Sequence, residues 1–288
     1  MHKLLLVLAL AATLLNPFGG AAACTLAGFA AHYVQVYRSQ GMVDDCYYQL
    51  VDDLGTARAV QLQVVALLAQ DWQRAGYKVG LTDSKARDMF GISQPLVGVL
   101  FKEMLLPDGA VVELDSATSL LVELDLLARV KSAEINQAKT VAEVARHIDA
   151  VIPFIELPDV LFTLDGDNPA ALLVAGNVGA KWGVVGKPVS VTNARELVES
   201  LPTMTLQLTD DTGAVLRAGQ GSLILEHPLN SILFLQQELA LSNETMKPGQ
   251  LLSLGAIGGP VKAERGRRYT AKYTGFGAGN VSVSVLVQ

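Results

Sequence analysis

The chain has 288 residues, of which 50% are hydrophobic and 17% are charged, and its formal net charge is −6. This length and composition suit a globular protein with a large core in one or two domains. The acidic balance, in a sequence without a basic cluster, argues against nucleic acid as a partner.

The first 23 residues are typical of a targeting segment. A short polar start that includes Lys3 precedes an apolar stretch from Leu4 to Leu15, and three alanines, 21–23, follow a Pro/Gly break. A secretory signal peptide has this order of charged start, apolar run and small-residue cleavage site. Roughly twelve apolar residues are too few for a permanent membrane span. We therefore expect 1–23 to be a signal peptide, and the mature chain to be exported, to a bacterial periplasm, without a membrane span.

The two cysteines, Cys24 and Cys46, both follow the expected cleavage site. Export would carry them into an oxidising compartment, where a Cys24–Cys46 disulfide can form and persist. The alternative is a lipid-modified Cys24 that anchors the protein, although Ala21 stands where a lipoprotein signal usually carries leucine. The mass of the intact protein before and after reduction separates the two.

The mature chain divides into a helical N-terminal region, residues 24–76, and a larger strand-rich part, residues 77–288. In the first, apolar residues from Ala57 to Trp72 recur near the 3.6-residue period, and Gly76 is a plausible helix end. In the second, short apolar runs alternate with Gly, Pro and Asp, which favours strands over 77–81, 97–101, 110–114, 120–130, 150–156, 172–177, 182–185, 203–209, 251–254, 269–273 and 281–287. Helices are expected over 141–147, with Thr140 as cap, and over 193–200 and 230–241. The fold class is therefore α+β.

Three carboxylates interrupt apolar runs that otherwise indicate buried strands. Glu123 and Asp125 lie within 120–130, and Glu156 ends 150–156. Residues i and i+2 of a strand share one face, so Glu123 and Asp125 should lie side by side. Burying like charges together is costly unless a cation neutralises them, and hard oxygen ligands suit Mg²⁺ or Mn²⁺. The alternatives are pairing with Arg129 or Lys131, or a half-exposed sheet.

Lys78 is a single lysine inside the apolar segment 76–82, between glycines. A buried lysine can act as an acid or base, or hold an anion. The alternative is a surface lysine whose stem packs along the protein while its charge reaches water.

Other polar motifs favour structural roles. The glycine-rich segment 275–279 precedes a strand and not a helix, so it indicates a turn and not a phosphate loop. Ser222 lacks the Gly-x-Ser-x-Gly pattern of a nucleophile elbow. Asn230 is a candidate N-cap for the helix that follows it.

In combination, these segments resemble the fumarylacetoacetate hydrolase superfamily, specifically its 2-keto-4-pentenoate hydratase and 4-oxalocrotonate decarboxylase branch. The resemblance runs from about Ala57 to Val287. The segments that carry it, in chain order, are Gly76–Thr82, Gln94–Leu100, Val122–Leu126, Pro153–Glu156, Ala175–Asn177, Gly221–Ser222, His227–Asn230 and Gly255–Pro260.

The resemblance implies a rolled mixed β-sheet domain behind a small helical region, and homo-oligomers. It also implies metal-assisted enolisation of 2-hydroxy-2,4-dienoates or their 2-oxo tautomers. The residues it assigns are Glu123, Asp125 and Glu156 as metal ligands, Lys78 as the acid/base or anchoring lysine, and Lys78, Asn177 and Ser222 as substrate contacts.

Two departures from the branch pattern affect function. Leu96 stands where its hydratases usually carry an aspartate near the metal, and Gly176 replaces another aspartate. An isobutyl side chain cannot relay a proton or orient water. The expected function is a metal-dependent, hydratase-like lyase for a small 2-oxo acid. The alternatives are a catalytically degenerate binding or accessory protein, and a decarboxylase or tautomerase on the same scaffold.

Overall fold

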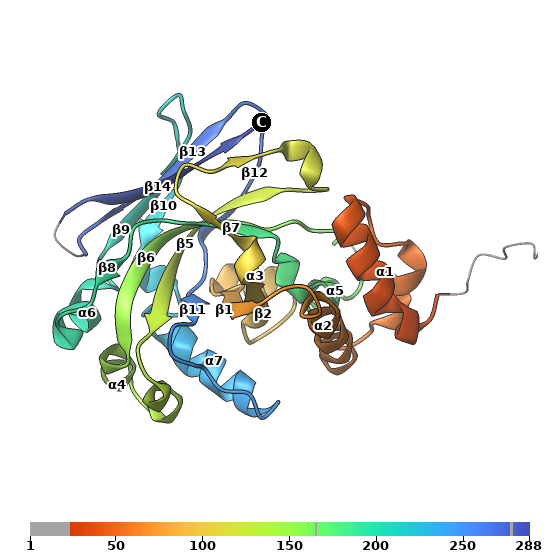
Figure 1. The fold of residues 1–288 in the computed structure, drawn as a ribbon, viewed down its shortest axis with the longest axis horizontal. Coiled ribbons are helices and arrows are strands. Elements are labelled where there is room, and N and C mark those ends of the chain that lie inside the picture. The colour runs from red at the N-terminus through yellow and green to blue at the C-terminus, as the bar shows by residue number, and fades with distance from the viewer. Residues whose placement is uncertain (1–23, 165, 277–278) are drawn as a thin grey trace, which may run out of the picture.

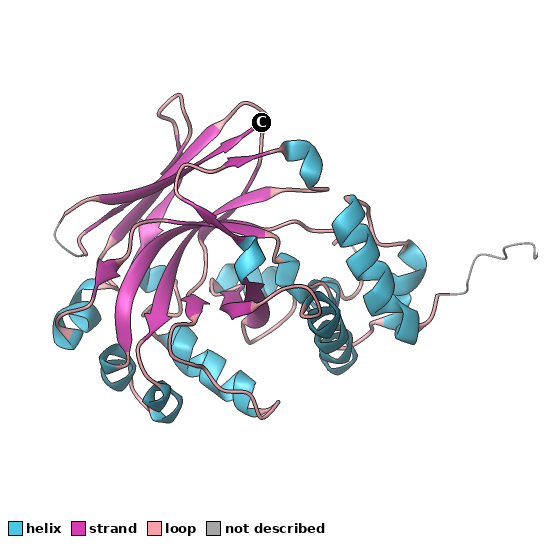
Figure 2. Ribbon diagram, viewed as in Figure 1, coloured by secondary structure: helices cyan, strands magenta, loops and turns pink. Residues whose placement is uncertain are grey.

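The computed structural model describes residues 24–164, 166–276 and 279–288, so the expected signal peptide lies outside the described residues. Figure 2 shows two curved sheets with helices along one side and at one end. The fold is α+β with a curled mixed sheet, as the sequence predicts. None of the helices in the described ranges combines the length and apolarity needed to cross a bilayer.

Six of the seven α-helices in the described residues form two groups. Those of the N-terminal region and α5 gather at one end of the molecule, whereas α4, α6 and α7 lie beside the sheets (Figure 1). Their bounds are α1 Leu26–Ser39, α2 Leu54–Leu68, α3 Ser84–Met89, α4 Val141–Arg146, α5 Pro169–Ala175, α6 Ala194–Ser200 and α7 Asn230–Ala240.

The strands form two sheets of mostly antiparallel pairs. The larger has the order β2-β1-β11-β5-β6-β7-β3, with β12 beside β5 and β8 beside β6, and the smaller has the order β10-β9-β13-β14-β4. The bounds are β1 Arg74–Gly80, β2 Leu96–Phe101, β3 Leu105–Pro107, β4 Val111–Val112, β5 Leu121–Val130, β6 Ile148–Leu157, β7 Trp182–Val185, β8 Val189–Ser190, β9 Thr205–Thr209, β10 Val215–Gln220, β11 Leu251–Ser253, β12 Ile257–Lys262, β13 Arg268–Thr274 and β14 Val281–Val287.

The main hydrophobic core is continuous from the N-terminal helices to the smaller sheet. Helix α1 packs on α2, α2 packs on α5, and β13 and β14 pack against β6. The opposite face of β5 and β6 carries a small separate cluster that includes Leu127, Ile152 and Phe154. That second face is the one that bears the predicted carboxylates.

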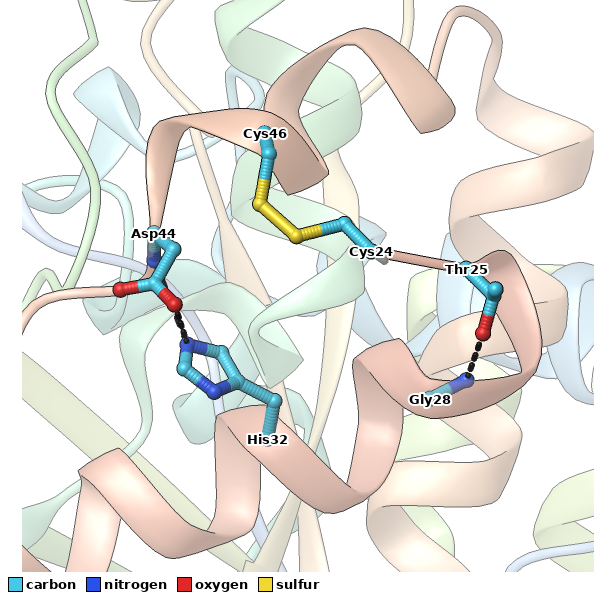
Figure 3. Close-up of a disulfide and its surroundings, with 6 residues drawn as sticks. All are labelled: Cys24, Thr25, Gly28, His32, Asp44 and Cys46. Carbon is cyan, nitrogen blue, oxygen red and sulfur yellow. Dashed lines mark hydrogen bonds and ion pairs between the residues drawn. A yellow bond between two sulfur atoms is a disulfide. The ribbon is translucent and has the colours of Figure 1, made fainter. Parts of the chain in front are cut away.

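The structure joins Cys24 and Cys46, whose Cα atoms lie 6.0 Å apart. Figure 3 shows the bridge between Cys24, which lies two residues before α1, and the 3₁₀ helix η1, Asp45–Leu50. Beside it, the Thr25 hydroxyl accepts a hydrogen bond of 3.1 Å from the Gly28 amide and caps α1. Every described cysteine is thus in the bridge.

Several predicted elements are confirmed almost to the residue. Strands β7 and β14 have the expected bounds, and α4 begins after Thr140, whose side chain forms a capping box with Glu143. Helix α6 is likewise capped by its preceding residue, Asn193. The segment around 275–279 connects β13 to β14, as expected of a turn, although residues 277 and 278 lie outside the described ranges.

The strand predicted over 172–177 is wrong, because Pro169–Ala175 forms helix α5. Its residues 170–175 are buried all round, so their apolar run has no helical period to distinguish it from a buried strand. The helix end predicted at Gly76 is also wrong. Helix α2 ends at Leu68, and Gly76 lies in β1, where a Cβ would sit 1.8 Å from the Leu251 carbonyl oxygen of β11.

Asn230 is the first residue of α7 and not its cap. Its side-chain nitrogen instead donates a hydrogen bond of 2.8 Å to the Leu225 carbonyl. Leu225 and Glu226 have positive φ angles of 47° and 67°, so this bond helps to hold a turn that L-residues rarely adopt.

Candidate metal and lysine site

Three carboxylates share one face of the larger sheet. In the antiparallel β5–β6 pair, Glu123 lies directly opposite Glu156, and Asp125 lies opposite Phe154. Opposed residues and residues two apart share a face, so Glu123, Asp125 and Glu156 all point to the same side. Asp125 and Glu156 are buried, and Glu123 is partly exposed.

Lys78 reaches the same face from β1. Its ammonium lies 2.5 Å from Oε1 of Glu156 and donates a hydrogen bond of 2.9 Å to the Val178 carbonyl. Lys78 is 2% exposed, so the surface-lysine alternative is wrong. Pairing of the carboxylates with Arg129 is also wrong, because the Arg129 guanidinium pairs with Asp149.

Burial changes the proton affinity of this group. Burial and the nearby Glu156 carboxylate raise the pKa of Glu123 to about 8 and that of Asp125 to about 7. Burial lowers the pKa of Lys78, but the charges of Glu156 and Glu123 outweigh it, so that the pKa of Lys78 lies above its ordinary value. Lys78 is therefore an ammonium ion at neutral pH.

Asp125 is the most firmly held of the three carboxylates. Its oxygens accept hydrogen bonds from the Ser253 hydroxyl, at 2.5 Å, and from the Gly255 amide, at 3.0 Å, as well as from the Leu126 amide. Ser253 lies in β11, directly between β1 and β5. The central carboxylate is thus fixed in orientation by three donors before any ligand binds.

The donor set fits a divalent cation in its chemistry. Fully ionised, three carboxylates against one ammonium leave two negative charges in a mostly buried place, which a dication would neutralise. Glu156 Oε1, apart from its ion pair with Lys78, has no hydrogen-bond partner in the described part of the chain. Within the same ranges, however, no three His, Cys, Asp or Glu side chains stand already converged as a metal cage.

Of the two departures from the branch pattern, one shares the face of this group and the other lies in the core beside α1. Leu96 opposes Gly80 in the β1–β2 pair, so it shares the face of Lys78 and presents a buried apolar side chain there. Gly176 is packed against aromatic rings, because a Cβ on it would lie 2.5 Å from Phe162 and 3.0 Å from the ring of Tyr33. No aspartate side chain fits at 176 in this packing.

The two other predicted substrate contacts lie in different surroundings. The Asn177 side chain pairs with the edge strand β2, accepting from the Val99 amide at 2.8 Å and donating to the Val99 carbonyl at 2.9 Å. That pairing gives Asn177 a structural role. Ser222 is exposed in the 3₁₀ helix η6, Gly221–Leu223, and its amide bonds to the Pro202 carbonyl. Among residues 24–164, 166–276 and 279–288, no hydrogen bond links Ser222 to the carboxylates.

Sequence reasoning missed Ser253, Thr82 and Tyr273. Ser253 is a polar residue inside an apolar strand, the same signal that identified the carboxylates. The buried Thr82 hydroxyl has no hydrogen-bond partner among the described residues and lies against Gly255. The Tyr273 hydroxyl contacts the backbone of Asp125 and Phe154 from the other sheet, which no pattern in β13 indicates.

No protein-family model matches the chain. Among curated relatives, 4-oxalocrotonate decarboxylase of Pseudomonas putida is 26% identical over 204 residues, which cover 70% of this chain and 75% of the relative. The 2-keto-4-pentenoate hydratase 1 of Dechloromonas aromatica is 27% identical over 236 residues, covering 81% of this chain and 86% of the relative.

Solved structures agree on the fold. The 4-oxalocrotonate decarboxylase from Pseudomonas putida G7, complexed with magnesium and adipate, matches with a TM-score of 0.80 at 24% identity, over 91% of this chain and 97% of that one. Fumarylpyruvate hydrolase from Pseudomonas aeruginosa, in complex with Mn²⁺ and pyruvate, matches with a TM-score of 0.56 at 14% identity, over 75% and 90%. The predicted resemblance is confirmed: the homologues of this chain are 2-keto-4-pentenoate hydratases and 4-oxalocrotonate decarboxylases, and its fold is of the fumarylacetoacetate hydrolase type.

Proposed function

We propose that the protein is a divalent-metal-dependent lyase that hydrates a small 2-hydroxydienoate through its 2-oxo tautomer. The observation that carries the proposal is the placement of Glu123, Asp125, Glu156 and Lys78 on one sheet face. Homologues that are hydratases and decarboxylases support the reaction class. Neighbouring structures with magnesium, calcium and manganese support a divalent cation, and we take Mg²⁺ or Mn²⁺ as the ion used.

Glu123, Asp125 and Glu156 would hold the cation, which would supply Lewis acidity toward the carboxylate and 2-oxygen of the substrate. The protein's own part is positional and electrostatic. Asp125 is fixed by its three donors, and Lys78, being charged, can anchor an anionic group or donate a proton. Lys78 is held beside Glu156 and the Val178 carbonyl, so its ammonium would lie next to a cation that Glu156 helped to hold and next to the substrate's anionic groups.

The test is an absorbance assay. The mature protein, with Mg²⁺ or Mn²⁺, is incubated with 2-hydroxypenta-2,4-dienoate, and the loss of the conjugated diene is followed. We expect a metal-dependent rate that falls at least about 100-fold in Glu123→Ala. A wild-type rate equal to that of Glu123→Ala would rule out the hydratase.

A second candidate is a binding or accessory protein without turnover. Leu96 favours it, because this buried isobutyl group lies on the lysine face where the relatives' pattern has a carboxylate. Calorimetry with oxalate or pyruvate in the presence of Mg²⁺ separates the two functions. Binding without turnover of any 2-oxo acid supports the binding protein, and turnover excludes it.

A third candidate keeps catalysis but changes its outcome to decarboxylation or tautomerisation. The match to 4-oxalocrotonate decarboxylase in both sequence and fold favours decarboxylation. Carbon dioxide released from a 2-oxo diacid, measured beside the diene assay, identifies this reaction. Hydration of the dienoate without such release excludes it.

The cellular setting completes the proposal. We propose that residues 1–23 direct export, that the mature protein acts in the periplasm with a Cys24–Cys46 bridge, and that it assembles as a homo-oligomer. The disulfide in the structure and the apolar run from Leu4 to Leu15 support export. Fractionation of cells that express the full chain tests the location, and light scattering of the mature protein tests the assembly.

A further inference from the structure

The Lys78 ammonium has two contacts, and one of them is a backbone carbonyl. Its contacts are Glu156 Oε1 at 2.5 Å and the Val178 carbonyl oxygen at 2.9 Å. The lysine stem passes over Gly98, where a Cβ would lie 2.8 Å from Lys78 Cγ. With the stem confined beside Gly98, the Val178 carbonyl is one of the two groups that contact the ammonium at its end.

That carbonyl belongs to an unusual turn. Asn177, Val178 and Gly179 have φ angles of 53°, 55° and 65°, so three successive residues are left-handed. For a β-branched residue such as Val178 this conformation is strained, and it persists only where neighbouring contacts impose it. The turn therefore needs external restraints.

Contacts from outside the turn supply these restraints. The Asn177 side chain pairs with Val99, and the Gly179 carbonyl accepts from the Asp159 amide at 2.9 Å. Two more contacts come from the N-terminal region. The Gln61 side-chain nitrogen of α2 lies 3.5 Å from Asn177 Oδ1, and the Tyr33 hydroxyl of α1 donates a hydrogen bond of 2.8 Å to the Gly176 carbonyl. Tyr33 is 1% exposed and stacks on Phe162, with ring centroids 5.7 Å apart.

We propose that Tyr33 is a positioning residue for Lys78. Its hydroxyl holds Gly176 at the start of the left-handed turn, and the turn in turn presents the Val178 carbonyl to the lysine ammonium. The inference deepens the proposed function, on which it rests for the role of Lys78 in proton transfer. It also gives the N-terminal region a part in the site, because α1 supplies the hydroxyl and the Cys24–Cys46 bridge closes the segment that contains α1.

The test compares two tyrosine-to-phenylalanine variants of the same helix. Tyr33→Phe removes the hydroxyl that bonds to Gly176 but keeps the ring. Tyr37→Phe is the matched control, because Tyr37 is also buried in α1 and its hydroxyl has no hydrogen-bond partner among the described residues. Both are made in the full mature chain with the disulfide intact.

Two measurements are independent of turnover. One is the ¹⁵N NMR resonance of the Lys78 ammonium, assigned by its loss in Lys78→Met. The other is hydrogen exchange over residues 176–181. We expect Tyr33→Phe to shift the Lys78 resonance and to speed exchange in this segment, and Tyr37→Phe to change neither.

A third measurement requires turnover. With Mg²⁺ and 2-hydroxypenta-2,4-dienoate, we expect kcat to fall about tenfold or more in Tyr33→Phe, with Mg²⁺ affinity unchanged, and to stay within about twofold in Tyr37→Phe. If the wild type has no activity, the proposed function fails, while the resonance and exchange data still decide the positioning role. The proposal is overturned if the two variants give the same Lys78 resonance and exchange, or if Tyr33→Phe loses its fold by circular dichroism.

Discussion

At the scale of single residues, the site holds more negative than positive charge in a mostly buried position. Glu123, Asp125 and Glu156 face one ammonium, Lys78, and burial together with the Glu156 carboxylate raises the pKa values of Glu123 and Asp125. Bound protons neutralise the carboxylate charge that a bound metal ion would otherwise neutralise. Proton binding and metal binding at this site should therefore compete.

The pH dependence of stability follows from that competition. Because the pKa values of Glu123 and Asp125 are raised, to about 8 and about 7, the folded protein holds protons that the unfolded chain has lost. The stabilisation by these protons is complete below about pH 4 and is lost as the pH rises toward 8. We measure the Tm of the chelator-treated protein over this range and subtract that of a Glu123→Gln/Asp125→Asn variant, which shares all other charges. We expect this corrected Tm to fall as the pH rises. A corrected Tm that rises toward pH 8 would contradict the assignment.

Lys78 should separate metal binding from turnover. Lys78→Met removes the ammonium but none of the carboxylate oxygens, so Mg²⁺ affinity should be kept or increased, because a competing positive charge is gone. Turnover should fall by about 100-fold or more through loss of the proton donor. Calorimetry measures the first and the diene assay the second. Loss of Mg²⁺ binding together with turnover would show that the lysine supports the metal site.

At the scale of elements, strand register places every member of the site. Lys78 opposes Gly98 in β2 and Ser253 in β11, and Glu123 opposes Glu156. Period-two alternation in the sequence sufficed to predict that Glu123 and Asp125 share a face. The cross-strand match to Glu156 and the approach of Lys78 depend on which strands pair, and no local pattern in one sequence specifies that pairing.

Substitution of Gly98 tests this register directly. Gly98→Ala places a Cβ 2.8 Å from both Lys78 Cγ and the Asn177 carbonyl oxygen, so we expect the lysine to be displaced and kcat to fall by about tenfold or more, at a stability cost of about 1–3 kcal/mol. The control is Gly166→Ala, where no atom lies within 4 Å of the added carbon. Equal kcat values for the two variants would contradict the geometry.

The largest errors of sequence interpretation also arise at this scale. The run 170–175 is apolar on every side because α5 is buried all round, and the helix-start signal of Pro169 at its first turn is weaker than that run. Gly76 has the sequence appearance of a helix end, but it is required by the close approach of β11. The structure of the run 170–175 and that of Gly76 are both determined by tertiary contacts with residues that lie far away in sequence.

At the scale of the whole molecule, the N-terminal helices are part of the same core as the sheets. Tyr33 and Phe162 fill the space beside Gly176, and the Asn177 and Gln61 side chains close the edge strand β2 at Val99 and Val97. The region predicted as a separate helical segment is thus packed against the site. Its disulfide should matter for the stability of the entire chain.

The disulfide gives a prediction at this scale. Reduction should raise the intact mass by about 2 Da and, for a closed loop of this length, lower the free energy of unfolding by about 3 kcal/mol. Mass spectrometry and denaturant unfolding measure the two effects. The Cys24→Ser/Cys46→Ser variant should have the lower stability already and should not respond to reductant. A diacylglycerol adduct on Cys24 would instead show that the protein is lipid-anchored.

Calorimetric titration of the chelator-treated mature protein with Mg²⁺ at pH 8, with oxalate present, most directly tests the claim that the three carboxylates hold a divalent cation. The account predicts one binding site per chain in the wild type and a loss of at least about tenfold in affinity in each of Glu123→Gln, Asp125→Asn and Glu156→Gln. Asp149→Asn, which removes a carboxylate paired with Arg129 elsewhere on the sheet, should bind as the wild type does. Absence of Mg²⁺ binding to the wild type, or equal affinity in all five proteins, would contradict the account.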